Sequence, residues 1–252
     1  MNDSILKSGE RIDDLEYKNL KIIQKKSGFK FGMDSVILSN FVEISRKKSI
    51  IFDLGTGTGI ISILVAGKKE NVEKVYGIEI QKDMAEMATR SVKLNRLEDK
   101  IEILNLDIKN LSSKDFSKKA DVVVTNPPYK KMDTGLLNCD EQKLISRHEY
   151  KCNLEDVINC ASKLLKDNGI FYMVHRPERL VDISILMREY KIEPKEIRFV
   201  SSRIGEDAKL ILIKGTKCGK PFLKVRNSLF IYEENGNYTE EIYKIYDKES
   251  RK

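Results

Sequence analysis

Four consecutive residues near the middle of the chain, Asn126, Pro127, Pro128 and Tyr129, can together hold a planar amino group. Asn126 offers a side-chain carbonyl, and Pro127 offers a backbone carbonyl with no N–H beside it. The two prolines keep the loop extended, and Tyr129 can lie on the face of a flat ring. Two acceptors fixed on one NH2 group promote attack by a nitrogen whose lone pair is otherwise delocalised. The motif therefore indicates chemistry on an amino group rather than a plain proline turn.

A glycine-rich segment follows the apolar run of residues 49–53. Asp53 is succeeded by glycines at alternate positions, Gly55, Gly57 and Gly59, which let the backbone turn tightly and approach a ligand closely. The spacing differs from the G-x-G-x-x-G of dinucleotide binders, and the acid before the loop opposes a phosphate and suits a cation. S-adenosylmethionine, with an ammonium, a sulfonium and no phosphate, meets that requirement.

Two more acids follow strand-like runs. Glu79 ends the second run, where a carboxylate can accept hydrogen bonds from two ribose hydroxyls. Asp107 follows the third and is either an acceptor for the adenine amino group of the cofactor or a plain helix cap. Together with the glycine loop, these acids predict a nucleoside-containing ligand.

The elements that must position these residues alternate along the chain. Apolar, β-branched runs predict strands, and the segments between them predict helices, which is the pattern of a parallel sheet covered on both faces. The predicted strands are residues 49–53, 75–79, 101–106, 121–125, 169–174, 197–201 and 210–214, and the predicted helices are residues 60–68, 82–95, 154–165 and 177–190. In such sheets ligands bind beyond the carboxyl ends of the strands, where the residues named above fall.

Over residues 49–215 the chain resembles the class I S-adenosylmethionine-dependent methyltransferases. The resemblance implies a Rossmann-like α/β fold, with a seven-stranded sheet, helices on both faces and an antiparallel last strand. It implies S-adenosylmethionine as cofactor, with the methionine part held from Asp53 to Gly59, the ribose by Glu79, and Asn126 bordering the same pocket. The catalytic residues it implies are Asn126, Pro127 and Tyr129. Residues 1–48 are then an N-terminal segment bordering the cofactor and RNA site, and residues 216–252 are a short extension. Within it, the sequence of residues 221–246 predicts a short β-hairpin with a tail helix.

The tetrad NPPY resembles the amino-methyltransferases, which include N6-adenine enzymes, some N2-guanine enzymes and enzymes that methylate glutamine in release factors. The short segment before the glycine loop disfavours a release-factor enzyme, and no large target-recognition domain of the DNA-modifying kind follows the NPPY motif. Flanking motifs match, in order, the tRNA N6-adenine methyltransferases that modify an adenine beside the anticodon of a valine tRNA. These motifs are residues 29–35, 147–149, 176–180 and 236–240.

That narrower resemblance predicts N6 methylation of an adenine in the anticodon loop of valine tRNA. The alternatives are N6-adenine or N2-guanine methylation of rRNA or DNA, and glutamine methylation of a release factor. It also implies that Phe31 and Asp34 border the cofactor pocket. The residues predicted to meet the substrate are Pro128, Tyr129, Lys130, Lys131, Arg147 and His148.

Three residues beyond the NPPY motif have two interpretations each. His148 is either a proton acceptor near the target amine or an ordinary polar loop residue. Arg176 and Arg179 either contact RNA or form ion pairs with Glu178 or Asp182.

The charge distribution also has two interpretations. The formal net charge is +7, with five lysines and no acid in residues 17–33, and six basic residues and no acid in residues 208–232. These stretches are either solvated faces of a lysine-rich protein or a phosphate-contacting surface.

Composition excludes several other classes. No stretch approaches the roughly 20 apolar residues that span a bilayer, and the N-terminus lacks the apolar core of a signal peptide. The four cysteines form no C-x-x-C pair and only two histidines exist, so no metal site is expected. We expect a cytoplasmic protein that binds no membrane, with a monomer favoured.

Overall fold

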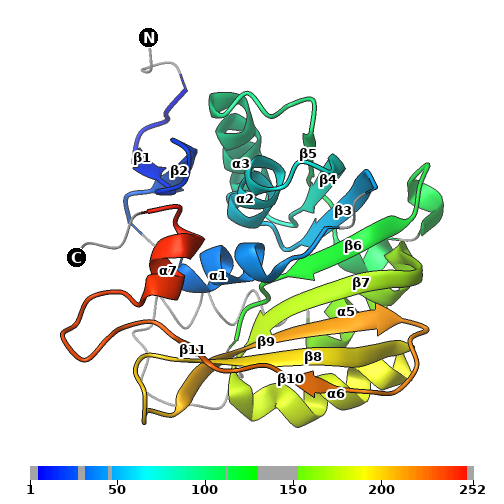
Figure 1. The fold of residues 1–252 in the computed structure, drawn as a ribbon. Coiled ribbons are helices and arrows are strands. Elements are labelled where there is room, and N and C mark those ends of the chain that lie inside the picture. The colour runs from blue at the N-terminus through cyan, green and yellow to red at the C-terminus, as the bar shows by residue number, and fades with distance from the viewer. Residues whose placement is uncertain (1–4, 28–31, 45–46, 112, 130–152, 249–252) are drawn as a thin grey trace, which may run out of the picture.

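The computed structural model describes residues 5–27, 32–44, 47–111, 113–129 and 153–248. Its centre is one mixed β-sheet with helices on both faces (Figure 1). The strands follow one another across the sheet in the order β10 (Lys224–Val225), β8 (Ile192–Ser201), β9 (Ala208–Lys217), β7 (Leu165–His175), β6 (Ala120–Thr125), β3 (Ser49–Leu54), β4 (Val72–Ile78) and β5 (Ile101–Leu104), and β11 (Leu229–Phe230) pairs with β8 as well.

The seven predicted strands are all present, and β9 runs antiparallel to both β7 and β8, as the resemblance implied. β10 and β11 add two strands of two residues each, which makes the sheet nine-stranded among the described residues. All six residues of β3 are buried, as are five of the six in β6, because helices cover both faces of these central strands.

Helices divide between the two faces of the sheet. One face packs against α1 (Met33–Phe41) and α2 (Ile60–Lys68), with α3 (Lys82–Leu94) beside them. The other packs against α5 (Leu154–Leu164) and α6 (Leu180–Glu189). Short 3-10 turns lie at η1 (Ile108–Asn110), η2 (Ser113–Asp115) and η3 (Pro177–Arg179). The helix predicted from residue 177 thus begins as η3 and becomes α-helical at Leu180.

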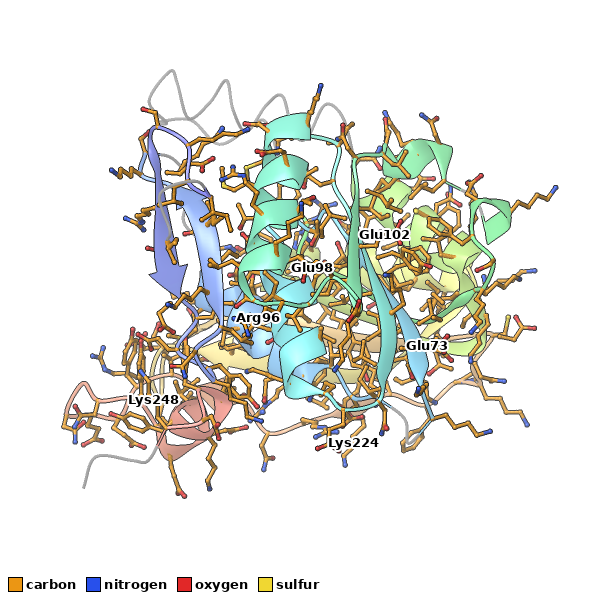
Figure 2. All side chains as sticks on the ribbon, turned by 90° about the horizontal axis from the view of Figure 1, so that it is seen from above. Glu73, Arg96, Glu98, Glu102, Lys224 and Lys248 are labelled. Carbon is orange, nitrogen blue, oxygen red and sulfur yellow. The ribbon has the colours of Figure 1, made fainter. Side chains whose placement is uncertain are left out.

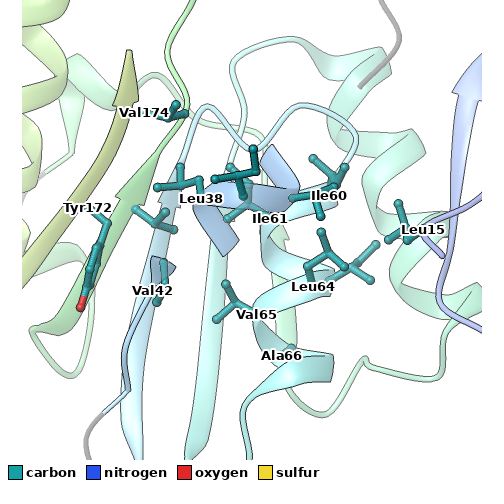
Figure 3. Packing of buried hydrophobic residues seen from close by; sticks show 14 of the residues in the cluster. Leu15, Leu38, Val42, Ile60, Ile61, Leu64, Val65, Ala66, Tyr172 and Val174 are labelled. Carbon is teal, nitrogen blue, oxygen red and sulfur yellow. The ribbon is translucent and has the colours of Figure 1, made fainter. Parts of the chain in front are cut away.

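The core beneath α1 and α2 joins distant parts of the chain (Figure 3). Leu38 and Val42 lie between Ile61 and Val65 of α2 and the strand residue Tyr172. The Tyr172 ring also meets Phe41 edge-on, with centroids 5.7 Å apart. This packing fixes α1 against the strands, so its first turn is held at the carboxyl edge of the sheet.

A two-stranded sheet formed by β1 (Glu10–Asp14) and β2 (Lys21–Lys25) precedes α1 and was not predicted. Polar groups of α3 tie it down. The backbone N–H of Ile23 donates to Ser91 Oγ (3.0 Å), and the Asn95 amide pairs with both backbone groups of Lys21. The side chains of α3 thereby satisfy backbone groups of an edge strand.

The C-terminal extension differs from its prediction. Within residues 221–246, where a short hairpin and a tail helix were predicted, β10 and β11 pair in parallel with β8 and not with one another. The hairpin is limited to residues 231–239, where Tyr232 bridges Tyr238 in antiparallel fashion and the Thr239 N–H donates to the Ile231 carbonyl. The predicted tail helix is present as α7 (Glu240–Ile245), which lies beside α1 and the N-terminal sheet (Figure 1).

Three cations of the two basic stretches pair with acids from elsewhere in the fold. Lys25 pairs with Asp83, and both Lys214 and Arg226 pair with Glu43. Figure 2 shows charges of both signs around the molecule, with Glu73, Glu98 and Glu102 on the side of β4 and β5, and Lys224 and Lys248 on the side of the C-terminal extension. For these three residues the pairs favour the interpretation as ordinary charged faces.

Two further expectations concern membranes and metals. In the described ranges, no helix is long and apolar enough to cross a bilayer. The same residues contain no group of three or more His, Cys, Asp or Glu side chains placed to hold a metal ion.

Candidate functional site

The predicted site residues meet at one edge of the sheet because four neighbouring parallel strands end there in register. Leu54 of β3 lies beside Ile78 of β4 and Thr125 of β6, and Thr125 lies beside Met173 of β7. The residues that follow these strands are therefore brought side by side. Thr125 Oγ1 also donates to the Leu54 carbonyl (2.9 Å), which links the two strand ends that carry the glycine loop and the NPPY loop.

The glycine loop requires glycine for its backbone. Gly55 and Gly57 have φ values of +72° and +59°, a conformation that other residues adopt only with strain. A Cβ added at either position meets nothing within 4 Å, so both glycines face open space. Gly59 (φ +91°) precedes α2, and a Cβ there would come within 3.3 Å of the Ala88 side chain. The loop thus presents bare backbone toward the space beyond the strands.

Asp53 is fully buried under this loop. Its Oδ2 accepts hydrogen bonds from Thr56 Oγ1 (2.6 Å) and from Ser62 Oγ (2.8 Å) and backbone N–H (3.1 Å). Its Oδ1 has no hydrogen-bond partner within the part of the chain that the structure describes. Burial, the largest cause, and the nearby Glu79 charge together raise the pKa of this carboxyl to about 6, against the lowering effect of the bonds from Thr56 and Ser62. A buried, half-satisfied carboxylate of this kind favours a cationic ligand.

Glu79 is also buried, and it supports the loop. Its Oε2 accepts from the backbone N–H of Gly57 (2.9 Å) and its Oε1 accepts from that of Gln81 (2.9 Å). Gln81 Nε2 donates to Oε1 as well, at 3.4 Å. A carboxylate has about four acceptor positions, so at least one remains for the ribose hydroxyls that the sequence predicted.

Asp107 follows β5 at the same edge. Its Oδ1 accepts from the backbone N–H of Lys109 (3.0 Å) and so caps η1, which is the second of its two interpretations. The other carboxylate oxygen keeps acceptor capacity for an adenine amino group. Beside it, Leu106 is 42% exposed and offers an apolar surface to a flat ring.

These donors and acceptors fit S-adenosylmethionine. The free Oδ1 of Asp53 suits the positively charged methionine part, Glu79 suits the ribose, and the open space at Gly55 and Gly57 admits a ligand against the backbone. The loop does not suit a phosphate group, because Asp53 and Glu79 lie against the backbone N–H groups that a phosphate would need.

Asn126 stands at the end of β6, held by a residue that sequence reasoning missed. Its Nδ2 donates to Ser35 Oγ of α1 (2.9 Å), which turns its carbonyl Oδ1 toward Tyr129 and the site. Pro127 is buried, whereas Pro128 is exposed. The amide and the first proline are therefore fixed by the fold, as an acceptor pair for an amine requires.

Tyr129 is folded back onto this pair. Its hydroxyl donates to Asp34 Oδ2 (2.7 Å) and is in short contact with Asn126 Oδ1. Burial raises the pKa of Tyr129 far above its ordinary value, and the Asp34 charge adds to the rise, so the phenol stays protonated. Asp34, predicted to border the cofactor pocket, thus makes its contact with the NPPY loop in this structure.

His175 and Arg176, at the end of β7, pack against Tyr129. The His175 ring meets the Tyr129 ring edge-on with centroids 5.3 Å apart, and the Arg176 guanidinium lies over the Tyr129 ring at 5.6 Å. Burial, followed by the Arg179 charge, lowers the pKa of His175 to about 4. His175 Nδ1 accepts from the Arg176 N–H (2.8 Å), so Nε2 carries the hydrogen of the neutral ring. Sequence reasoning missed His175, although its place directly after a predicted strand was a usable signal.

Arg176 and Arg179, each predicted either to contact RNA or to form an ion pair, differ in their contacts. Arg179 pairs with Asp182 (2.7 Å), which confirms the ion-pair interpretation for this residue. Arg176 instead donates to the Lys209 carbonyl (3.3 Å) and covers Tyr129. It lies where a substrate phosphate or base could meet it.

Several predicted site residues lie outside the described residues. They are Phe31, Lys130, Lys131, Arg147 and His148. Their predicted roles at the cofactor and substrate stay predictions.

Comparison with known proteins gives concordant matches. A family profile described as "Methyltransferase domain" matches residues 45–210. A Porphyromonas gingivalis protein named tRNA1(Val) (adenine(37)-N6)-methyltransferase is 31% identical over 199 residues, 77% of this chain and 74% of its own. A Phocaeicola vulgatus protein of the same name is 26% identical over 223 residues, 86% of this chain and 92% of its own. Among solved structures, a predicted O-methyltransferase from Agrobacterium tumefaciens superposes with a TM-score of 0.69 at 24% identity, covering 85% of this chain and 96% of that one.

Proposed function

The chain belongs to the methyltransferase family that includes the proteins named tRNA1(Val) (adenine(37)-N6)-methyltransferase, and from this premise we propose that it methylates the N6 amino group of an adenine in tRNA. It is a class I S-adenosylmethionine-dependent N-methyltransferase. The finer proposal is that the target lies in the anticodon loop of valine tRNA, as the names of its relatives suggest. The proposal includes the cytoplasmic location and the monomeric state expected from the sequence.

One observation carries the proposal: the Asn126 amide is fixed beside the glycine loop with its carbonyl facing the site. Ser35 holds the amide nitrogen, and the strand pairing of β3 with β6 sets Gly55 and Asn126 at neighbouring strand ends. The Asn126 Oδ1 and the Pro127 carbonyl are the two acceptors that an exocyclic NH2 group requires. A pair of acceptors next to a cofactor loop supports chemistry on an amine rather than on a hydroxyl.

The bound cofactor supplies a methyl group on a positively charged sulfur. Asn126 and Pro127 accept the two hydrogens of the target amine, which favours a pyramidal nitrogen whose lone pair points at that methyl carbon. With the cofactor bound, the nitrogen would take the methyl group and leave a neutral thioether, and the amine held by Asn126 and Pro127 would carry one extra proton. The amine then loses its extra proton to water, so no general base is needed before transfer.

Tyr129 and its neighbours support a flat nucleobase as the target. An adenine in a tRNA loop has to leave its stack, which costs a few kcal/mol, and stacking on an aromatic ring returns part of that cost. The Arg176 guanidinium over the Tyr129 ring adds a positive charge where the nucleic acid backbone follows the base. Single-stranded RNA loops open more readily than duplexes, which favours tRNA over DNA.

The test is a product assay. The purified protein is incubated with isotopically labelled S-adenosylmethionine and total tRNA from a strain that lacks the gene, and the tRNA is digested to nucleosides for mass spectrometry. The expected product is labelled N6-methyladenosine, and sequencing of the labelled RNA is expected to give valine tRNA.

Other labelled products assign the substrate differently. Label in rRNA, DNA or a release-factor glutamine, with none in tRNA, would refute the tRNA proposal and keep the methyltransferase activity. Label as N2-methylguanosine would refute the adenine assignment.

A further inference from the structure

The first turn of α1 contacts the NPPY loop with two consecutive side chains. Asp34 Oδ2 accepts from the Tyr129 hydroxyl, and Ser35 Oγ accepts from Asn126 Nδ2. Asp34 Oδ1 accepts from the Ser35 N–H (2.8 Å), which fixes the carboxylate at the helix start. A Cβ at Gly32 would come within 2.6 Å of Asp34 Oδ1, so the glycine leaves room for the carboxylate.

The Tyr129 hydroxyl cannot donate a full hydrogen bond to both of the oxygens that it contacts. A phenol has one hydrogen, whereas two acceptor oxygens, Asp34 Oδ2 and Asn126 Oδ1, lie in contact with it. A hydrogen bond to a carboxylate is roughly twice as strong as one to an amide carbonyl, so Asp34 takes the hydrogen. The bond to Asn126 Oδ1 is then the weaker of the two that the hydroxyl makes, so this oxygen is the less satisfied acceptor.

The arrangement leaves Asn126 Oδ1 available as a hydrogen-bond acceptor for the target amine. An incoming NH2 group brings two hydrogens, so it satisfies Asn126 Oδ1 better than the phenol oxygen does. Ser35 meanwhile occupies the amide nitrogen, so the amide cannot turn its NH2 toward the substrate without losing that bond. Ser35 is 5% exposed, which excludes water as an easy substitute.

We propose that Asp34 and Ser35 are positioning residues for methyl transfer: Asp34 draws the Tyr129 hydroxyl hydrogen away from Asn126, and Ser35 orients the Asn126 amide. The inference rests on the proposed function, since it concerns the acceptor of the target amine. It gives Asp34 a role different from cofactor binding, which the family resemblance implied for it. Both residues act through the NPPY loop and neither is assigned to the reacting atoms.

A double-mutant cycle tests the role of Asp34. In Asp34→Asn the competing charge is gone, the phenol hydrogen turns to Asn126 Oδ1, and the amine has to displace it. We expect kcat/KM to fall roughly tenfold, the size of one ordinary hydrogen bond, with the calorimetric affinity for S-adenosylhomocysteine unchanged. Tyr129→Phe removes the hydroxyl, so Asp34→Asn is expected to cause no further loss in that background.

Ser35→Ala is the second variant, and Ser39→Ala is its matched control. Ser39 is a buried serine of the same helix whose hydroxyl donates to the Val36 carbonyl and contacts no part of the loop. We expect Ser35→Ala to lower kcat with cofactor affinity unchanged, and Ser39→Ala to leave kcat unchanged. Equal losses in both serine variants, or an Asp34→Asn loss that is the same with Tyr and Phe at position 129, would overturn the inference. A loss of affinity for S-adenosylhomocysteine in Asp34→Asn would instead assign Asp34 to cofactor binding.

A substrate-free measurement separates this inference from the proposed function. A buried hydroxyl hydrogen held by a carboxylate exchanges slowly, and proton NMR is expected to detect it as a downfield signal that Tyr129→Phe removes. The signal should persist in Ser39→Ala and shift upfield in Asp34→Asn. An unchanged signal in Asp34→Asn refutes the inference whatever the substrate is, whereas tRNA that stays unlabelled by the wild type refutes only the proposed function.

Discussion

At the scale of single residues, the site depends on where each polar atom finds its partner. Asn126 donates its NH2 group to Ser35, which leaves its carbonyl for the proposed acceptor role, and Asp53 keeps one oxygen without a partner among the described residues. Both side chains could be named from the sequence. Their orientation could not, because Ser35 lies 91 residues from Asn126 along the chain.

The acceptor role of Asn126 predicts a selective loss of catalysis. Asn126→Ala removes a hydrogen-bond acceptor that acts mainly in the transition state, so we expect kcat to fall on the order of 100- to 1,000-fold. Calorimetry with S-adenosylhomocysteine is expected to give an affinity close to that of the wild type. Asn110→Ala, an exposed asparagine of η1, is the control and should keep full activity. Normal activity in Asn126→Ala would refute the role.

The buried carboxyl of Asp53 predicts that cofactor binding depends on pH. Its pKa in the free protein is raised from 3.8 to about 6, so the carboxyl is protonated below that pH and charged above it. A positively charged ligand needs the charged form, so affinity should fall by up to about tenfold per pH unit below pH 6. Calorimetric titrations between about pH 5 and pH 8 measure how the affinity for the cofactor changes with pH. Asp53→Ala is expected to abolish binding, and a flat wild-type profile would contradict this account.

The same shift has a consequence for stability. Because the folded pKa of Asp53 lies above the unfolded one, the native state holds the extra proton between these two values. The contribution of this group to the free energy of unfolding therefore decreases as pH rises through that window, and is least favourable above about pH 6. A cationic ligand offsets this penalty by pairing with the charge.

At the scale of elements, the periodicity of the sequence predicted most of the helices and strands of residues 49–215. The predicted helix of residues 60–68 matches α2, and the valine run of residues 121–125 lies within β6. The N-terminal sheet was missed because its strands are short and its backbone partners, Ser91 and Asn95, come from α3 far along the chain. The predicted C-terminal hairpin is limited to residues 231–239 for a related reason, since the two short strands before it pair with the edge of β8.

The anchoring of the N-terminal sheet to α3 predicts a stability effect. Arg90 is 14% exposed and donates to both Glu10 and Glu86, and its guanidinium holds the pKa of the Glu10 carboxyl below its usual value. Arg90→Ala leaves the buried Glu10 carboxylate unpaired, so we expect the free energy of unfolding to fall by roughly 2 kcal/mol, measured by urea denaturation. Lys93→Ala, an exposed lysine of the same helix, should change it by less than about 0.5 kcal/mol. Equal effects would contradict the anchoring.

At the scale of the whole molecule, the question is which cations are left to meet a polyanion. Lys25, Lys214 and Arg226 are paired with acids, so sequence stretches rich in lysine overstate the basic surface. Arg176 lies over the Tyr129 ring and pairs with no acid among the described contacts. It is therefore a cation at the proposed site that remains for a phosphate.

This distinction predicts how tRNA binding responds to salt. Affinity should weaken steeply as salt rises, with each phosphate contact contributing about 0.7 to 0.9 to the log–log slope. Arg176→Ala is expected to lower the slope by about one such contact in fluorescence anisotropy titrations. Lys118→Ala is the control, since this lysine is paired with Glu73 just before β6, at the other end of that strand from the site. If Arg176→Ala left the slope of the salt dependence unchanged, Arg176 would not contact a phosphate of the tRNA.

The sequence by itself determined the fold class, and it predicted the carboxyl edge of the sheet as the site with Asp53, Glu79 and Asn126 in it, because local runs and spacing encode strands and the turns that follow them. Only the tertiary structure decided which groups act on these residues. Ser35 and His175 reach the NPPY loop because α1 and β7 pack beside β6. Contacts between distant segments depend on how whole elements pack, and no local pattern in one chain records them.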